Sequence, residues 1–541
     1  MVGSEHLNVF TGPDSVRKYF DPEYSPPLPL VEIPDCLNPY RGDGVRIYAK
    51  MMSMHPATNV KVMPAMNLLD KGIEPGVTKT VVESSSGSTV ISMAMVARAF
   101  HGIDDVHAYL SNKTSETKLR LMQFFGLDVT LFGGPSQPTP VDERGGIRAA
   151  ARKAAESDSV CSPNQYVNDD NWKSHVRWTG PQIHRQLPEI NVIVASMGTA
   201  GTMTGLGTYF NEAKPSVYRI AVCTNAGERV PGPREYSLME EVKFPYKEAH
   251  DALEEVSAPD SFSLSLDLSR QGIVCGPSSG ITLKGLFQRI EKMKQEGTLS
   301  QIAGPDGEVH CVFMCSDLPY QYLNEYFATL GPEKFRPLRN ESMLMVLQKL
   351  RHVDLYRYDD SWELQALPAL SSYFNIHPLG SHDTVLSLAD QLDKALTARP
   401  NTQVLDFRRS SDYDAFHLPN SVNIPLDALR DGASRGSPFA NIADDCDMLE
   451  EVWLELEELF TIKDKNGKRN ASAEALMALL RGKKVLTLCY DGDTARVANS
   501  VLRAKSVNAE SIRGGYAALS ELQMPCNDTC KVTVMPVSLE V

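Results

Sequence analysis

Residues 80–90 of this chain are Thr-Val-Val-Glu-Ser-Ser-Ser-Gly-Ser-Thr-Val. The β-branched start, residues 80–83, predicts a short strand, and the apolar residues 91–100 predict a helix. The loop between them is rich in hydroxyl groups, at a position where a helix start presents free backbone N–H groups. This composition is typical of an anion site and equally of a plain serine-rich N-cap. Strand, turn and helix in this order predict a parallel α/β fold.

The same rhythm extends from about residue 45 to residue 330. Residues 45–49 and 192–195 are further candidate strands, and the run at 309–315 has the apolar character of a buried strand. Ligands of parallel α/β folds bind at the carboxyl ends of the strands. We therefore examine the turns that follow these strands for functional residues.

A lysine stands in one of these turns. Residues 59–67 are Asn-Val-Lys-Val-Met-Pro-Ala-Met-Asn, and Pro64 suits the first turn of a helix. Partial burial beside the positive end of a helix would lower the pKa of Lys61 and favour the free amine that a Schiff base requires. Taken alone, this segment is also compatible with an ordinary solvated lysine.

A glycine-rich turn follows the strand at 192–195. Residues 198–205 are Gly-Thr-Ala-Gly-Thr-Met-Thr-Gly, whose small positions allow backbone N–H groups to surround a phosphate. The turn lacks the Lys-Ser/Thr pair of a Walker loop and the GxGxxG spacing of a dinucleotide site. On its own it is a weak signal.

Together, in this order, the three segments resemble the cysteine synthase and cystathionine β-synthase family of pyridoxal-phosphate enzymes. Residues 165–175, 179–183 and 272–280 are also similar to that family, and the resemblance covers roughly residues 27–330. It implies a two-lobed, tryptophan-synthase-β-like α/β fold with pyridoxal 5'-phosphate as cofactor.

The resemblance implies a role for each segment. Lys61 would hold the cofactor covalently and later act as general base at Cα. Ser278 would hydrogen-bond the pyridine nitrogen. A hydroxyl partner leaves that nitrogen largely unprotonated, which favours β-elimination over transamination. The other expected cofactor contacts are Ser88, Gly198, Thr199, Ala200, Gly201 and Thr202. The expected substrate contacts are Ser85, Ser86, Gly87, Thr89 and Gln165.

Three departures from the family pattern stand near this site. Ser88 occupies the position where an asparagine usually contacts the phenolic oxygen of the cofactor, and a serine reaches less far. Val62 and Met63 replace an Asp-Arg pair, and Asn59 replaces a serine. These changes bear on the choice of substrate more than on cofactor binding.

A second α/β rhythm begins near residue 378 and ends near residue 524. Residues 403–407 and 484–489 are its candidate strands, and residues 448–460 have the spacing of an amphipathic helix. Residues 404–408, His417-Leu418-Pro419 and Gly514-Gly515-Tyr516 resemble a rhodanese domain over about residues 380–525.

The second strand of this region leads into Cys489. A cysteine between a strand and a helix start faces N–H groups that stabilise a thiolate or a persulfide. A buried, inert cysteine is the competing interpretation. In the family an arginine is frequent at the positions of Tyr490 and Thr494, whereas this loop carries Asp491 and Asp493. Both acids oppose an anionic sulfur and an anionic donor such as thiosulfate. We therefore expect a persulfide donor; whether Arg496 offsets these acids depends on its direction.

Bulk properties narrow the class of protein. The 541 residues predict more than one domain, and 42% hydrophobic with 23% charged residues is a globular balance. A net charge of -14 argues against a nucleic-acid partner. The N-terminal residues lack a targeting pattern and no apolar run is long enough for a membrane span, so we expect a cytoplasmic protein without a membrane partner. The ten cysteines, including Cys526 and Cys530, form no disulfide framework or zinc pattern, so we expect no metal site.

We expect a cysteine synthase-like domain at 1–335, a connector at 336–378, a rhodanese-like domain at 379–525 and a tail at 526–541. The leading functional hypothesis is β-replacement on an O-acetylserine-like substrate by a sulfur nucleophile, giving L-cysteine, with the fused domain handling persulfide sulfur. The family further implies a homodimer. Desulfhydrase or lyase chemistry, replacement by a non-sulfur nucleophile, and a non-catalytic scaffold remain alternatives.

Overall fold

The computed structural model describes residues 8–85, 87–134, 142–343, 362–376, 396–429, 445–463 and 467–522. The chain divides into two compact units, Met1–Phe335 and Arg336–Val541. The predicted tail at 526–541, with Cys526 and Cys530, and position Ser86 lie outside the described residues.

The described part of the first unit contains two sheets. The larger has the strand order β1-β2-β10-β7-β8-β9, in which only β1 is antiparallel to its neighbour. Its strands are β1 Leu30–Glu32, β2 Val45–Met51, β7 Val192–Ser196, β8 Tyr218–Thr224, β9 Ala252–Val256 and β10 Val309–Cys315. The smaller sheet is parallel, in the order β5-β4-β3-β6. Its strands are β3 Thr80–Ser84, β4 Asp105–Ser111, β5 Asp128–Phe132 and β6 Val160–Cys161.

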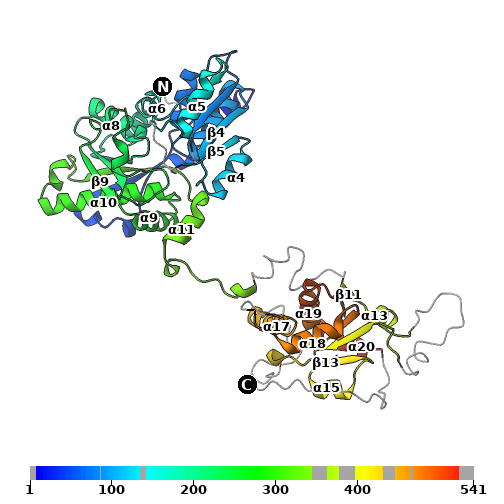
Figure 1. Cartoon of the computed structure of the whole chain (residues 1–541). Coiled ribbons are helices and arrows are strands. Elements are labelled where there is room, and N and C mark those ends of the chain that lie inside the picture. Colours follow the sequence, from blue (N-terminus) through cyan, green and yellow to red (C-terminus); the bar gives the residue numbers. More distant parts are fainter. Residues whose placement is uncertain are drawn as a thin grey trace. The chain divides into compact units, whose positions relative to one another are not determined.

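Helices cover both sheets and form two lobes. Figure 1 shows β4, β5, α4 and α5 in one lobe and β9, α8, α9 and α10 in the other. The helices are α1 Ser15–Phe20, α2 Val62–Gly72, α3 Ser88–His101, α4 Glu116–Phe124, α5 Gly146–Ala155, α6 Asp170–Ser174, α7 Gly180–Gln186, α8 Gly201–Ala213, α9 Ala258–Arg270, α10 Pro277–Glu296 and α11 Leu323–Thr329. A π-helical turn, His175–Thr179, joins α6 to α7.

The central strand of the larger sheet confirms the prediction for residues 309–315. Every residue of β10 is buried, because β2 and β7 flank it and helices cover its faces. A parallel strand covered on both faces has an uninterrupted apolar sequence, which is why this run contains no alternation. The strands predicted at 45–49, 80–83 and 192–195 are confirmed as β2, β3 and β7.

The described part of the second unit contains one parallel sheet, in the order β11-β15-β14-β12-β13. Its strands are β11 Glu363–Leu364, β12 Thr402–Asp406, β13 Ser421–Asn423, β14 Lys484–Leu488 and β15 Asn508–Ile512. Its helices are α13 Ala366–Tyr373, α15 Ser410–Ala415, α17 Cys446–Leu459, α18 Ala471–Leu480, α19 Asp493–Ala504 and α20 Gly515–Ser520.

The structure differs from the expected connector at 336–378 in one respect. Within that stretch, β11 pairs with β15 and α13 packs in the same hydrophobic core as β12 and β14. β11 and α13 therefore belong to the fold of the second unit. The loosened pattern of this stretch did not indicate them because β11 has only two residues.

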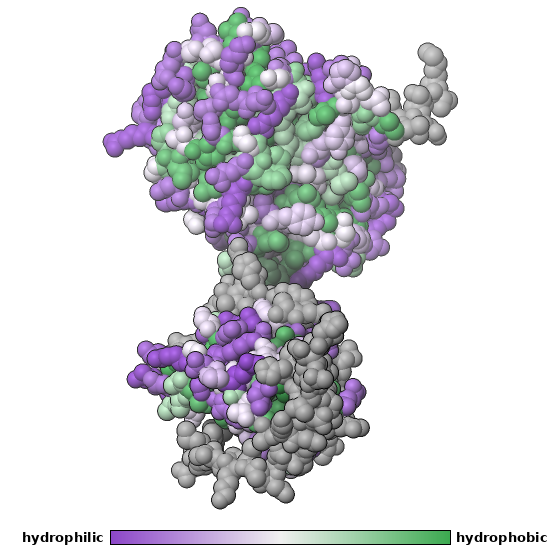
Figure 2. Space-filling model, turned by 90° about the vertical axis from the view of Figure 1, so that its right-hand side faces the viewer, coloured by the Kyte–Doolittle hydropathy of each residue, from purple (hydrophilic) through white to green (hydrophobic). Residues whose placement is uncertain are grey.

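Apolar side chains remain on the surface of the first unit. Figure 2 shows hydrophobic residues gathered among hydrophilic ones on the visible face of this unit. Phe124, Tyr320 and Phe327 are among its exposed large side chains. Among the described residues, no helix combines the length and the apolar character that crossing a bilayer requires.

Candidate active sites

The turns singled out in the sequence meet at one cavity of about 170 Å³ in the first unit. The segments come together because β2, β3, β7 and β10 place their carboxyl ends on this side. Of the expected residues, the cavity is lined by Lys61, Ser85, Gly87, Ser88, Thr89, Gln165, Gly198, Thr199, Thr202 and Ser278. Ala200 and Gly201 lie in the same turn without lining the cavity.

Lys61 stands at the start of α2, where its backbone N–H donates to Oδ1 of Asn59 at 2.9 Å. Burial lowers the pKa of Lys61 to about 8, and the guanidinium of Arg234 acts in the same direction, while Asp317 opposes both. About a tenth of such an amine is neutral at pH 7, against a negligible fraction at the ordinary lysine pKa. Lys61 can therefore act as a nucleophile and as a base near neutral pH.

The departure at residues 62–63 has a packing explanation. Val62 and Met63 are both buried in the core of this unit. An apolar pair there replaces the ion pair of the family without leaving a buried charge unsatisfied. Asn59, the third departure, accepts from the hydroxyl of Ser92 at 3.0 Å and so connects the lysine segment to α3.

The hydroxyl loop after β3 is held by Gln165. The Thr89 hydroxyl donates to Oε1 of Gln165 at 2.9 Å, and Nε2 of Gln165 donates to the carbonyl of Ser84 at 3.2 Å. The carboxylate of Glu83 accepts from the backbone N–H groups of Ser84 and Gln165. Burial raises the pKa of Glu83 to about 7. Gln165 thus fixes the loop, and α3 begins at Ser88, three residues before the predicted start.

The glycine turn after β7 admits no larger side chains at two positions. A Cβ on Gly198 would lie 2.5 Å from the carbonyl oxygen of Gly232, and one on Gly201 would lie 2.1 Å from Oδ1 of Asn171. Ala200 adopts a left-handed conformation with a φ of 66° and caps α8. Thr199 and Thr202 of this turn line the cavity, and the turn leads into the thirteen-residue helix α8. Backbone N–H groups at such a helix start favour an anion.

A buried histidine positions Thr202. Nδ1 of His175 lies 2.9 Å from the hydroxyl of Thr179, and its Nε2 lies 3.2 Å from the hydroxyl of Thr202. Burial, assisted by Lys61, lowers the pKa of His175 to about 3, so the ring is neutral near pH 7. A neutral ring both donates and accepts, which orients the hydroxyl of Thr202 without adding charge.

The sequence did not single out four charged groups of this cavity, Lys118, Arg229, Arg234 and Asp317. Asp317 is buried, and its Oδ1 has no hydrogen-bond partner among the described residues, while Oδ2 accepts from the Tyr322 hydroxyl at 2.5 Å. Burial raises the pKa of Asp317 to about 6. Asp317 follows β10 by two residues, so the rule that directed attention to the other turns also identifies this one.

Cys489 lies in the second unit, in the loop between β14 and α19. Its Sγ accepts from the backbone N–H of Gly492 at 3.1 Å, and the thiol donates to Oδ1 of Asp491 at 3.6 Å. Burial, with Asp491 as the next cause, raises the pKa of the thiol to about 12, although the surrounding N–H groups act in the opposite direction. This loop therefore holds a protonated thiol at neutral pH.

Of the two acids in this loop, Arg496 pairs with Asp493 and not with Asp491. Its guanidinium bonds to Glu363 at 2.7 Å and to Asp493 at 3.1 Å. Because Glu363 belongs to β11, the arginine connects α19 to the sheet edge and leaves Asp491 beside the sulfur. The sequence left the direction of the Arg496 side chain open, and these contacts give this side chain a structural role.

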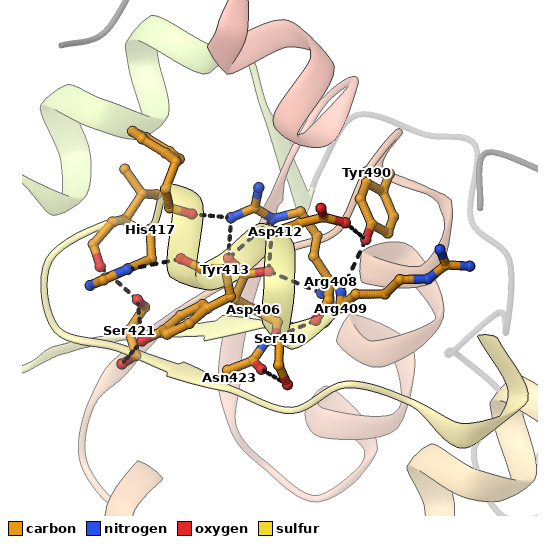
Figure 3. A network of polar contacts seen from close by, with 12 residues as sticks. Asp406, Arg408, Arg409, Ser410, Asp412, Tyr413, His417, Ser421, Asn423 and Tyr490 are labelled. Atoms are coloured by element: carbon orange, nitrogen blue, oxygen red, sulfur yellow. Dashed lines mark hydrogen bonds and ion pairs between the residues drawn. The ribbon is translucent and has the colours of Figure 1, made fainter. Parts of the chain in front are cut away.

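The polar network in Figure 3 fixes the other side of the cysteine loop. The hydroxyl of Tyr490 accepts from the backbone N–H of Arg409 at 3.1 Å and donates to Asp412. Asp406 and Arg408 form a fully buried ion pair at 2.8 Å, the strongest fixed element of this network. Tyr490 is therefore anchored to α15 and to its N-cap residue Arg409.

Residues 26–303 match the family model described as pyridoxal-phosphate dependent enzyme, which is more than half of the chain, so the chain belongs to this family. Residues 388–522 match the rhodanese-like domain. Both resemblances predicted from the sequence are confirmed, and pyridoxal phosphate is the cofactor of the first unit.

Within this family, the chain is similar to several synthases. Cysteine synthase B of Pseudomonas aeruginosa is 30% identical over 257 residues, 46% of this chain and 82% of that protein. The N-(2-amino-2-carboxyethyl)-L-glutamate synthase of Ralstonia nicotianae is 28% identical over 280 residues, 49% of this chain and 80% of that protein. The crystal structure of O-acetyl serine sulfhydrylase isoform 3 from Entamoeba histolytica has 21% identity and a TM-score of 0.47, covering 61% of this chain and 95% of that one. The family match and the similarity to cysteine synthase B make the chain an enzyme of the cysteine synthase family.

The residues of the cavity fit the cofactor. A lysine with a lowered pKa and a turn whose glycines admit no larger side chain line the same cavity, as an aldehyde and a phosphate on one molecule require. Ser278, in the first turn of α10, contributes a hydroxyl to the same space. No part of this donor set conflicts with pyridoxal phosphate.

Proposed function

We propose that this protein catalyses pyridoxal-phosphate-dependent β-replacement on a β-activated serine such as O-acetylserine, with a sulfur nucleophile giving L-cysteine as the first candidate product. The observation that carries the proposal is the convergence of Lys61, the hydroxyl loop 85–89 and the glycine turn 198–202 on one cavity. The similarity to cysteine synthase B supports the choice of substrate.

Each segment has a distinct task in this reaction. Lys61 binds the cofactor and, once released, removes the proton at Cα, for which its lowered pKa provides the neutral amine. The loop with Ser85, Ser86, Gly87 and Thr89 binds the substrate carboxylate, and Gln165 fixes that loop. The turn 198–202 holds the phosphate, and Ser88 and Ser278 hydrogen-bond the cofactor ring. Bound pyridoxal phosphate supplies the electron sink for charge developing at Cα.

A second candidate keeps the same reaction and changes the nucleophile to an amine. The name of the Ralstonia relative describes a product in which an amine nitrogen is joined to a three-carbon amino acid. The observation that favours this candidate is the cationic lining of the cavity, to which Lys118, Arg229 and Arg234 all contribute, because it suits the carboxylates of an amine such as glutamate in the name of that relative.

For the second unit we propose persulfide transfer through Cys489 with a donor other than thiosulfate. The protonated thiol and the adjacent Asp491 disfavour a dianionic donor. Thiosulfate:cyanide activity that disappears in Cys489→Ala would contradict this choice. We further propose a cytoplasmic homodimer, for which the exposed apolar side chains of the first unit provide a surface.

The test of the main proposal is the visible absorption of the purified holoenzyme together with acetate release from O-acetylserine. Wild-type protein should show both, and Lys61→Ala should lose the lysine-linked absorption and reduce turnover at least about a thousandfold. Lys71→Ala, on the exposed part of the same helix, is the matched control and should retain both. Acetate release that survives in Lys61→Ala refutes the assignment.

A further inference from the structure

A second cavity, of about 240 Å³, lies beside the first. It shares Lys118, Arg229 and Pro231 with the first cavity, and we call it the vestibule. Its remaining lining consists of Lys113, Thr114, Ser115, Phe262, Glu325 and Thr329. One water molecule takes about 30 Å³ of liquid, so the vestibule is far larger than a sulfide ion needs.

Lys118 is the buried charged group of the vestibule lining. It is buried, with 9% of its surface exposed, and forms neither an ion pair nor a hydrogen bond with the described residues. Its ammonium lies 4.9 Å from the ring of Tyr322, a contact that offsets only part of the loss of hydration. Burial lowers the pKa of Lys118, and Glu325 and Asp317 partly oppose this effect. A buried ammonium that has no hydrogen-bond acceptor in the protein can bind an acceptor group of a ligand.

Ser115 provides an independent observation at the same place. Its hydroxyl is buried and has no partner among the described residues, although the residue is the N-cap of α4. The neighbouring hydroxyl of Thr114 already donates to the carbonyl of Ser111 at 2.8 Å. The Ser115 hydroxyl and the start of a nine-residue helix therefore remain to bind an acceptor such as a carboxylate.

The net charge of the vestibule is positive, which also favours an anionic ligand. Lys113, Lys118 and Arg229 contribute three cations, and Glu325 contributes one carboxylate. Lys118 and Arg229 stand at the border with the first cavity, so an anion held by them lies next to the reacting substrate. Free sulfide, a single small atom, has no group that would use the Ser115 hydroxyl and two cations together.

We propose that the vestibule binds a carboxylate of the incoming nucleophile, so that the second substrate is a small carboxylate-bearing amine or thiol rather than free sulfide. This inference rests on the β-replacement proposed above, and it replaces L-cysteine as the first candidate product by a product that keeps the carboxylate of the nucleophile. The Cβ–oxygen bond of the activated serine breaks, and acetate leaves with its electron pair. The nucleophile's nitrogen or sulfur forms the new bond to Cβ and loses one proton, while Cα returns to its protonated state. The exchange is redox-neutral and needs no further reactant.

The first experiment measures binding without turnover. Glutarate, which has two carboxylates and no nucleophile, is titrated into the holoenzyme by isothermal calorimetry. Lys118→Gln and Arg229→Gln should each raise the Kd about tenfold. The matched control Arg120→Gln removes one cation from the exposed side of the same helix and should leave the Kd unchanged. Equal Kd values for all four proteins, or no binding to the wild type, overturn the proposal. Because Arg229 is exposed, the fold of its variant does not depend on core packing.

The second experiment compares nucleophiles at fixed O-acetylserine. L-glutamate tests the amine, mercaptosuccinate tests the thiol, and sulfide is the reference, with acetate release as the readout. A higher kcat/KM for either carboxylate nucleophile than for sulfide, reduced about tenfold in Lys118→Gln, supports the proposal. A higher kcat/KM for sulfide than for both overturns it and leaves β-replacement intact. Absence of acetate release with all three refutes the proposed reaction instead, and the glutarate titration then decides the vestibule alone.

Discussion

Lys61 and Cys489 each lie between a strand and the helix that follows it, and burial affects them in opposite ways. Lys61 lies between β2 and α2, and Cys489 lies between β14 and α19. Burial lowers the pKa of Lys61 to about 8 and raises the pKa of Cys489 to about 12. The reactive form of lysine is neutral and that of cysteine is an anion, so the same desolvation activates the first residue and suppresses the second. Whether burial activates or suppresses a nucleophile thus depends on the charge of its reactive form.

Lys50 allows the sharpest test of this comparison, because it is a buried lysine outside both cavities. Its ammonium donates to the carbonyl of Leu28 at 2.7 Å, to Gln186 at 2.8 Å and to Gln182 at 3.2 Å. Burial lowers the pKa of Lys50 to about 7. Between this value and the unfolded value of 10.5 the unfolded chain binds one proton more, so the free energy of unfolding rises as pH rises.

We expect Lys50→Met to remove up to about 1.4 kcal/mol per pH unit of this dependence. Denaturant unfolding of wild type and variant at pH 7.5, 8.5 and 9.5 measures the difference in slope. Lys71→Met, an exposed lysine of α2, is the control and should keep the wild-type slope. Parallel curves for wild type and Lys50→Met would show that burial of this lysine does not determine its proton affinity.

At Cys489, removal of the adjacent carboxylate should release part of the suppression. Asp491→Asn eliminates the charge that raises the thiol pKa after burial, and leaves the N–H groups that lower it. We expect alkylation of Cys489 by iodoacetamide at pH 8 to become about tenfold faster. Mass spectrometry of the labelled peptide follows the rate, and Asp414→Asn, on the exposed face of α15, serves as control. An unchanged rate would assign the suppression to burial alone.

At Lys61, two neighbours act in opposite directions and give the smallest expected effects. Arg234 lowers the lysine pKa and Asp317 raises it. Arg234→Gln should therefore slow uptake of pyridoxal phosphate by the apoenzyme at pH 7, about threefold, and Asp317→Asn should accelerate it by a similar factor. Stopped-flow absorbance over a range of pH gives both midpoints. Shifts of the same sign in the two variants would exclude a charge effect.

The strand-turn-helix segments were predictable because their signals are local. A β-branched run before a loop rich in hydroxyls indicated β3, and a glycine turn before a helix indicated the start of α8. Of the cavity residues missed by the sequence, Asp317 has such a signal at the end of β10, whereas Lys118 has none. Lys118 is an ordinary helical lysine until Tyr322, two hundred residues further along the chain, covers it.

The sequence by itself determined the two α/β units, the family of the first unit and the order of its candidate site segments, because hydrophobic period and turn chemistry are properties of neighbouring residues. Only the tertiary structure decided the charge state of the nucleophiles and the direction of Arg496. It alone also placed Lys118, Arg229 and Ser115 around one vestibule. Proton affinity and ligand space depend on what burial removes from water, and burial is decided by contacts between residues distant in the chain.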